Sequence, residues 1–163
     1  MSTIDGLPAH ILLVHFIVVV APLTALLAIA AAVGRPVRDR LVWLIAVLAA
    51  LTLVLTPLTT EAGEWLEKRV PRSAAVHTHT ELGDSMVYFS VALAVVAAVL
   101  VVVHLRERRG HSVRRGMAIA VTALAIVVGA ATIWQVYRIG DSGARATWGD
   151  TSDVSAAASP ATE

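Results

Sequence analysis

Four long stretches of this chain lack Asp, Glu, Lys and Arg, and they constrain the fold more than any other feature. They cover residues 11–33, 41–60, 86–105 and 117–137. A helix rises about 1.5 Å per residue, so about 20 residues cross a hydrocarbon core of about 30 Å. Apolar side chains occupy nearly every position rather than alternate ones, unlike a membrane β-barrel strand. The sequence therefore predicts an all-α integral membrane protein, a four-helix bundle.

The composition supports a membrane location and removes several functional classes. With 57% hydrophobic and 15% charged residues, the chain is too apolar for an ordinary soluble domain, and the lipid bilayer is its expected partner. The absence of cysteine removes disulfides, thiolate metal sites and iron–sulfur clusters. A net charge of +1 without a basic domain gives no support to nucleic-acid binding. Residues 1–149 are the expected membrane domain, and residues 150–163 are expected to be a disordered polar tail.

Basic residues predict how the chain is oriented. Arginines fill the loops between the first two spans and between the last two: Arg35, Arg38 and Arg40 in one, and Arg106, Arg108, Arg109, Arg114 and Arg115 in the other. On the opposite side, acidic residues outnumber basic ones. By the positive-inside rule, we expect both arginine loops in the cytoplasm and both termini outside, in a multi-pass protein of the plasma (inner) membrane. The first span follows Asp5 and no basic residue, and is expected to be a retained helix rather than a signal peptide.

Histidines are the most informative polar residues. His10, His15, His77 and His79 all belong to the predicted outer side. His15 lies about 7.5 Å deeper than His10 along a helix, where a polar ring needs a partner. The candidate partners and supporting residues are His79, Glu61, Gln135 and Asp141. Two interpretations of His15 remain open: an interhelical hydrogen bond that fixes packing, or a ligand or proton-relay group.

A second pattern of histidines precedes the third span. His77, His79 and Glu81 alternate in a segment that we expect to be extended. Alternate residues of an extended segment point to the same side, which would bring two imidazoles and a carboxylate together. The pattern predicts a metal site, and the alternative is a solvated loop.

Two segments resemble a known family. Residues 6–16, Gly-Leu-Pro-Ala-His-Ile-Leu-Leu-Val-His-Phe, resemble the Gly-Leu-Pro-x-His-Pro-Leu-Leu-Val-His-Phe-Pro start of a bacterial membrane family, the domain of unknown function 2231. Residues 138–148 resemble its terminal Gly-x-Ser-Gly-Ala-x-x-x-Trp segment. Ile11 and Ile17 stand where the family usually has proline. The resemblance extends over residues 6–149 and implies four spans and the positions of a site, without a reaction.

Glycines in the second of these segments predict how the site is closed. Gly140, Gly143 and Ala144 favour a tight turn after the fourth span. Such a turn would set Asp141 above the bundle near His10.

Three functions are compatible with these patterns. The first is a redox-associated subunit that binds haem b or a metal ion through His10 or His15 together with His77 or His79, because neutral imidazole is the best ligand available without cysteine. The second is a non-enzymatic structural or accessory protein whose polar cluster ties helix ends together. The third is a proton or ion pathway, which the apolar halves of the spans near the arginine loops disfavour.

No motif identifies a catalytic residue, so an enzyme is not expected. The candidate partners are other membrane or redox proteins, or a second copy of the chain.

Overall fold

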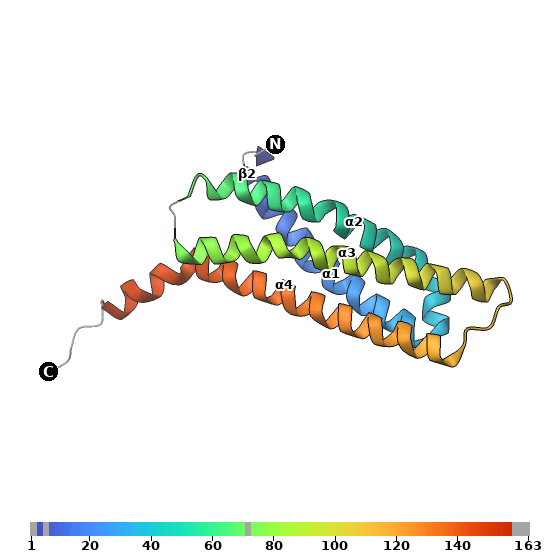
Figure 1. The fold of residues 1–163 in the computed structure, drawn as a ribbon. Coiled ribbons are helices and arrows are strands. Elements are labelled where there is room, and N and C mark those ends of the chain that lie inside the picture. Colours follow the sequence, from blue (N-terminus) through green and yellow to red (C-terminus); the bar gives the residue numbers. More distant parts are fainter. Residues whose placement is uncertain (1–2, 5–6, 71–72, 158–163) are drawn as a thin grey trace.

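The fold consists of four long helices that run alternately up and down (Figure 1). The computed structural model describes residues 3–4, 7–70 and 73–157, with side chains for 10–70 and 73–148. The helices are α1 (Ala9–Val33), α2 (Arg35–Glu67), α3 (Ala74–Arg108) and α4 (Arg115–Ala157). Each is long and apolar enough to cross a membrane, which confirms the four predicted spans and the all-α bundle. Ahead of α1, β1 (Thr3–Ile4) pairs antiparallel with β2 (Leu7–Pro8), with Thr3 opposite Pro8.

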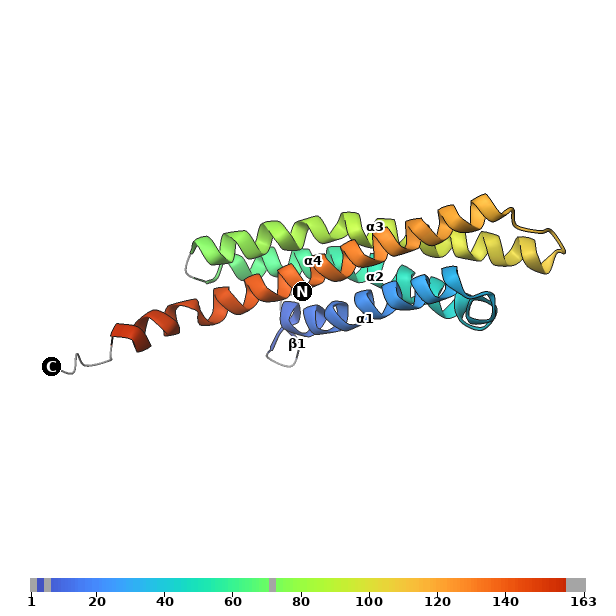
Figure 2. The same ribbon diagram turned by 90° about the horizontal axis from the view of Figure 1, so that it is seen from below.

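The helices form a closed ring in which each packs against its neighbours in the chain and α1 also packs against α4 (Figures 1 and 2). The buried face of α1 is made of small residues, with Ala21, Ala25, Ala28 and Ala31 at most 1% exposed. Small side chains let helices approach closely where lipid offers no hydrophobic drive for association. The wider outer surface carries large exposed apolar side chains, as a lipid-facing surface requires.

All four helices extend beyond the apolar stretches that predicted them. The third was expected to begin at residue 86, but α3 begins at Ala74, where Ser73 caps it by accepting a hydrogen bond from the Val76 amide at 3.2 Å. The prediction of an extended segment at residues 77–81 is therefore wrong. The residues before position 86 are too polar to continue the apolar pattern, but the helix includes them.

The C-terminal part of the chain differs in the same way. α4 was expected to end at residue 137, but it continues to Ala157 and projects past the other helices (Figures 1 and 2). The predicted tight turn at Gly140, Gly143 and Ala144 is wrong, because these residues lie inside α4. The sequence contains no proline between Pro71 and Pro160 to interrupt the helix. Of the expected tail, residues 150–157 are helical, and residues 158–163 lie outside the described part of the chain.

The two ends of the bundle carry different polar groups. The histidine end, as we name it, contains His10 of α1 and His79 of α3, and the arginine end contains Arg38 of α2 and Glu107 of α3. Between them lies an apolar core nearer the arginine end, consisting of Ala28, Ala31, Val42, Ile45, Ala49, Val96, Ala97, Leu100 and Ala125. The ends are thus separate sites on one scaffold.

Candidate functional site

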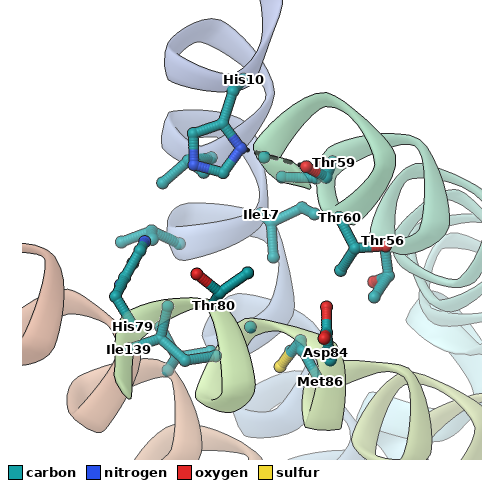
Figure 3. A pocket seen from close by; sticks show the side chains of 15 residues that line it. His10, Ile17, Thr56, Thr59, Thr60, His79, Thr80, Asp84, Met86 and Ile139 are labelled. Atoms are coloured by element: carbon teal, nitrogen blue, oxygen red, sulfur yellow. Dashed lines mark hydrogen bonds between the residues drawn. The ribbon is translucent and has the colours of Figure 1, made fainter. Parts of the chain in front are cut away.

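A cavity of about 80 Å³ lies at the histidine end, and all four helices line it (Figure 3). Its walls include His10 and Ile17 of α1, Thr56, Thr59 and Gly63 of α2, His79, Asp84 and Met86 of α3, and Val136 and Ile139 of α4. Most of this lining is apolar, so the few polar atoms that reach the cavity decide what it can bind.

His10 lies in the first turn of α1 and forms a hydrogen bond with the backbone of α2. Its Nδ1 is 3.0 Å from the carbonyl oxygen of Thr59. A carbonyl oxygen can only accept, so Nδ1 carries the proton and donates it. The neutral ring then has its lone pair on Nε2, the nitrogen that a metal or a donor can use.

Gly63 makes this contact possible. It follows Thr59 by four residues in α2, so it lies one helical turn further along, beside the Thr59 carbonyl. A Cβ at Gly63 would lie 3.0 Å from Cε1 and 3.1 Å from Nδ1 of His10. Glycine therefore leaves the space in which the imidazole rests against the backbone of α2.

His79 is held in a similar way by α4. Its Nδ1 is 3.0 Å from Oγ of Ser142, and Ser142 donates its single hydroxyl proton to the Ile139 carbonyl at 2.9 Å. Because that proton is committed, the Ser142 oxygen accepts from Nδ1 of His79, and the lone pair of His79 also lies on Nε2. A Cβ at Gly143 would lie 3.1 Å from Cε1 of His79, so this ring too rests where a glycine leaves room.

The two imidazoles meet at one end of the cavity. Their centroids are 6.3 Å apart and their planes are 83° from parallel. Figure 3 shows the His10 and His79 rings on opposite sides of this space, one from α1 and one from α3. Both rings thus have Nδ1 occupied by a protein acceptor and Nε2 without a protein partner among the described residues. This tautomer, with Nδ1–H donated to a protein acceptor and the Nε2 lone pair free, is typical of metal-ligating histidines.

His15 does not join this pair, so the prediction that it does is wrong. It is exposed, and its Nδ1 lies 2.6 Å from the carbonyl oxygen of Ile11 in the same helix. His15 follows His10 by five residues, which places it about 140° further around α1. A ring that far around the helix cannot face the same cavity, and His15 faces the surroundings of the bundle instead.

His77, His79 and Glu81 do not converge either. In a helix, His77 and His79 lie about 160° apart around the axis, so only His79 turns inward. His77 forms an exposed pair with Glu81, with 3.4 Å between Nε2 and Oε1. Across the described residues no three His, Cys, Asp or Glu side chains are grouped to hold a metal ion. The predicted three-ligand set is therefore not formed.

The supporting residues are divided between the interior and the surface. Gln135 is 3% exposed and reaches across to α3, where Nε2 donates to the Leu82 carbonyl at 3.0 Å and to Oγ of Ser85 at 2.7 Å. Gln135 thus connects α4 to α3 rather than to His15. Glu61 is exposed on α2, and Asp141 accepts from Nε of Arg145 at 3.0 Å on the surface of α4, so neither lines the cavity.

The groups that orient the two rings were not predicted from the sequence. The Thr59 carbonyl has no signature in the sequence, and Gly63 is only an isolated glycine in a helical pattern. Ser142 and Gly143 did carry a signal, because they belong to the C-terminal Gly-x-Ser-Gly segment. The structure brings that segment against His79, beside the histidine of the N-terminal motif.

The size of the cavity tests the predicted cofactors. Sites for cofactor-sized ligands usually have volumes of about 300 to 1,000 Å³. At about 80 Å³, this cavity is too small for haem b between His10 and His79. A single ion with a few small ligands fits.

Among the comparisons with known proteins, a match to a family assigns the chain. Neither the curated proteins nor the solved structures include a match. Residues 6–156, however, match the family described as "Predicted membrane protein (DUF2231)". With four candidate spans and a match over most of its length, this multi-pass membrane protein belongs to the DUF2231 family.

Proposed function

We propose that the protein binds one transition-metal ion at the histidine end, between Nε2 of His10 and Nε2 of His79. The observation that carries the proposal is the fixed tautomer of both rings, because each donates Nδ1–H to an oriented acceptor. A metal needs the neutral imidazole with a free lone pair, and a hydrogen bond at the other nitrogen orients that lone pair. With centroids 6.3 Å apart, the rings leave space for an ion between them.

The donor set favours Cu(I) over Zn(II). Zinc generally takes three or four protein ligands, and although Asp84 also lines the cavity, the described residues contain no group of three His, Cys, Asp or Glu side chains that could hold a metal ion. Met86 lines the same cavity with its sulfur, and soft thioether and imidazole ligands suit copper (Figure 3). Cu(I) is thus the expected ion, and the membrane subunit would take part in copper handling or in electron transfer.

A second candidate is a structural role, which the same hydrogen bonds favour. His10 links α1 to α2 and His79 links α3 to α4, so the rings tie the helix ends in pairs. In an apolar solvent such bonds contribute about 0.6 to 2 kcal/mol each. This role requires the Nδ1 bonds alone and makes no use of the Nε2 lone pairs.

Metal binding by purified variants separates the two. Detergent-purified protein is titrated with Cu(I) against a chromogenic chelator, with Zn(II) and Ni(II) in parallel, and stoichiometry is measured by elemental analysis. We expect one Cu(I) per chain in the wild type, and loss of that ion in His10→Ala and in His79→Ala. His15→Ala and His77→Ala are the matched controls, because both rings are exposed and outside the cavity.

The outcomes are distinct. A wild type that binds none of these ions would contradict the proposal, as would a His79→Ala protein that still binds copper like the wild type. Lower thermal stability of both inward-facing variants without any metal binding would establish the structural role instead.

We further propose that the histidine end faces the outside of the plasma membrane, on the basis of the arginines at the opposite end. Because the chain has no cysteine, single cysteines report accessibility cleanly. Ala74→Cys, at the start of α3, should react with a membrane-impermeant maleimide in intact cells, whereas Ser112→Cys, between α3 and α4, should react only after lysis. The reverse pattern would invert the topology.

A further inference from the structure

The arginine end contains a buried ionic network that links three helices. The side chain of Arg38 is 8% exposed and that of Glu107 is 11% exposed. Arg38 donates from Nη2 to both carboxylate oxygens at 2.8 Å and from Nε to Oε2 at 3.1 Å. Its Nη1 donates to the Ala31 carbonyl at 2.8 Å, near the end of α1. This bidentate geometry holds the guanidinium and the carboxylate rigidly.

The charged groups next to this ion pair differ in the distance to their partners. Asp39 faces His104, whose side chain is 3% exposed and whose Nδ1 lies 3.0 Å from Oδ1. Arg35 has only long contacts, with Nε 3.8 Å from Asp39 and 4.0 Å from Glu107, and its side chain is 63% exposed. The guanidinium of Arg35 is therefore the group that remains open to a ligand.

A second cavity, of about 140 Å³, lies beside these groups. Arg35, Arg38 and Glu107 form its charged wall. The other walls are apolar and come from the ends of α1 and α3, the α3–α4 loop and α4: Ala32, Val33, Val103, Val113, Ala118 and Val121. The cavity thus combines two guanidinium groups and one carboxylate with an apolar surface at the end of the spanning bundle.

The charge and shape of this cavity match the phosphate of a lipid. Arg38 is matched closely by Glu107, whereas Arg35 has only Asp39 at 3.8 Å and Glu107 at 4.0 Å and keeps a guanidinium that is open to solvent. Planar guanidinium groups bind phosphate oxygens bidentately. Basic pockets between membrane helices on the cytoplasmic side are known to take anionic lipid headgroups. The apolar walls would contact the first part of the acyl chains, for which a free phosphate has no equivalent.

We propose that this cavity binds the headgroup of one anionic phospholipid, with Arg35 as the phosphate ligand. Arg38, fixed by Glu107 and the Ala31 carbonyl, forms the rigid floor of the site. The site would join the ends of α1, α2 and α3 to the start of α4 through a single lipid. It is independent of the metal site, because the apolar core lies between them.

Lipid binding to delipidated full-length protein tests this. Native mass spectrometry counts adducts with phosphatidylglycerol or phosphatidylcholine, and thermal unfolding is measured with each lipid and with inorganic phosphate. We expect one retained phosphatidylglycerol and a higher unfolding midpoint with it alone. Arg35→Gln should weaken this binding about fivefold. Arg40→Gln is the matched control, an exposed arginine on the same helix that does not line the cavity.

The result that overturns the proposal is equally clear. Equal binding of phosphatidylglycerol by Arg35→Gln and Arg40→Gln, or equal binding of the two lipids by the wild type, would contradict it. Protection by inorganic phosphate as strong as that by the lipid would assign the cavity to a soluble anion. The unfolding midpoint of lipid-free Arg35→Gln should equal that of the wild type, which excludes misfolding as the cause.

Discussion

At the histidine end, two glycines leave the space in which each imidazole rests against a neighbouring helix. Gly63 lies four residues after Thr59, whose carbonyl accepts from His10, and Gly143 directly follows Ser142, whose hydroxyl oxygen accepts from His79. A side chain at either glycine would cover that position. The glycines therefore orient His10 and His79 without touching a ligand themselves.

Substitution of Gly143 by alanine should weaken metal binding. The new Cβ would lie 3.1 Å from Cε1 of His79 and move the ring. Changes to groups that orient a ligand typically cost about 10- to 100-fold in metal affinity. Copper titration of Gly143→Ala is compared with Gly83→Ala, which also lines the cavity but whose Cβ would meet nothing within 4 Å. Equal loss of affinity in both variants would contradict the steric explanation.

Ser142 should act through His79 alone. Ser142→Ala removes the acceptor of Nδ1–H, so the ring loses its orientation and its fixed tautomer. We expect an affinity loss of about 10- to 100-fold and near recovery in Ser142→Thr, which retains the hydroxyl. Isotope-edited NMR of the histidine side chains should show a mixture of tautomers in the alanine variant. An unchanged tautomer there would contradict the assignment.

His10 and His79 were identified from the sequence, but their partners were not. The all-round apolar character of α1 gives no indication of which face turns inward, so His15 could not be distinguished from His10. Placing His79 with His77 and Glu81 failed because a polar segment was interpreted as extended when it is helical. The acceptors at Thr59 and Ser142 depend on packing between distant segments, which a single sequence does not contain.

At the scale of elements, hydropathy predicted the number of helices correctly and underestimated their lengths. An apolar stretch indicates which residues can lie in lipid, whereas a helix continues as far as its backbone hydrogen bonds continue. α2 therefore runs to Glu67 and α3 starts at Ala74, both well outside the predicted spans. These additional turns position Gly63 and His79, so part of the site lies beyond the apolar stretches that predicted the spans.

Packing between α1 and α4 depends on Gly129. A Cβ there would lie 2.7 Å from Cδ1 and 3.1 Å from Cγ1 of Ile29, so the Ile29 side chain would have to move, whereas the Ala25 carbonyl at 3.5 Å would be in ordinary contact. Gly129→Ala should lower the free energy of unfolding by about 1 to 3 kcal/mol, as overpacking does. Thermal unfolding in detergent measures this, with Gly140→Ala in the same helix as control, because its Cβ would meet nothing within 4 Å. Partial recovery in the double variant Gly129→Ala, Ile29→Ala would confirm the clash.

For the whole molecule, the arginine end contributes most of the buried charge. Arg38 and Glu107 connect α2 to α3, and Arg38 also reaches α1. Loop charge related Arg38 to orientation alone and did not single out Glu107, because a sequence does not show that two loop-flanking charges are buried against each other. Arg38 thus belongs both to the buried ion pair and to the arginine pattern from which the orientation was predicted.

Breaking this ion pair should destabilise the entire bundle. Glu107→Gln leaves Arg38 charged and poorly paired in a buried position, and we expect a loss of about 3 to 5 kcal/mol. Replacement of both partners, Arg38→Met with Glu107→Leu, should cost much less, because no unpaired charge remains. Thermal unfolding of the three proteins in one detergent tests this. A double variant as unstable as the single one would contradict a pairing effect.

The apolar core between the two ends limits the route that an ion could take through the bundle. Ile45, Val96 and Leu100 are at most 1% exposed and close the middle of the bundle beyond the histidine cavity. The metal ion proposed to bind between His10 and His79 would therefore meet a closed apolar core rather than a path to the arginine end. Under the proposed metal binding, loading and unloading would both take place at the histidine end of the bundle, and a partner that exchanges the ion would act at that end.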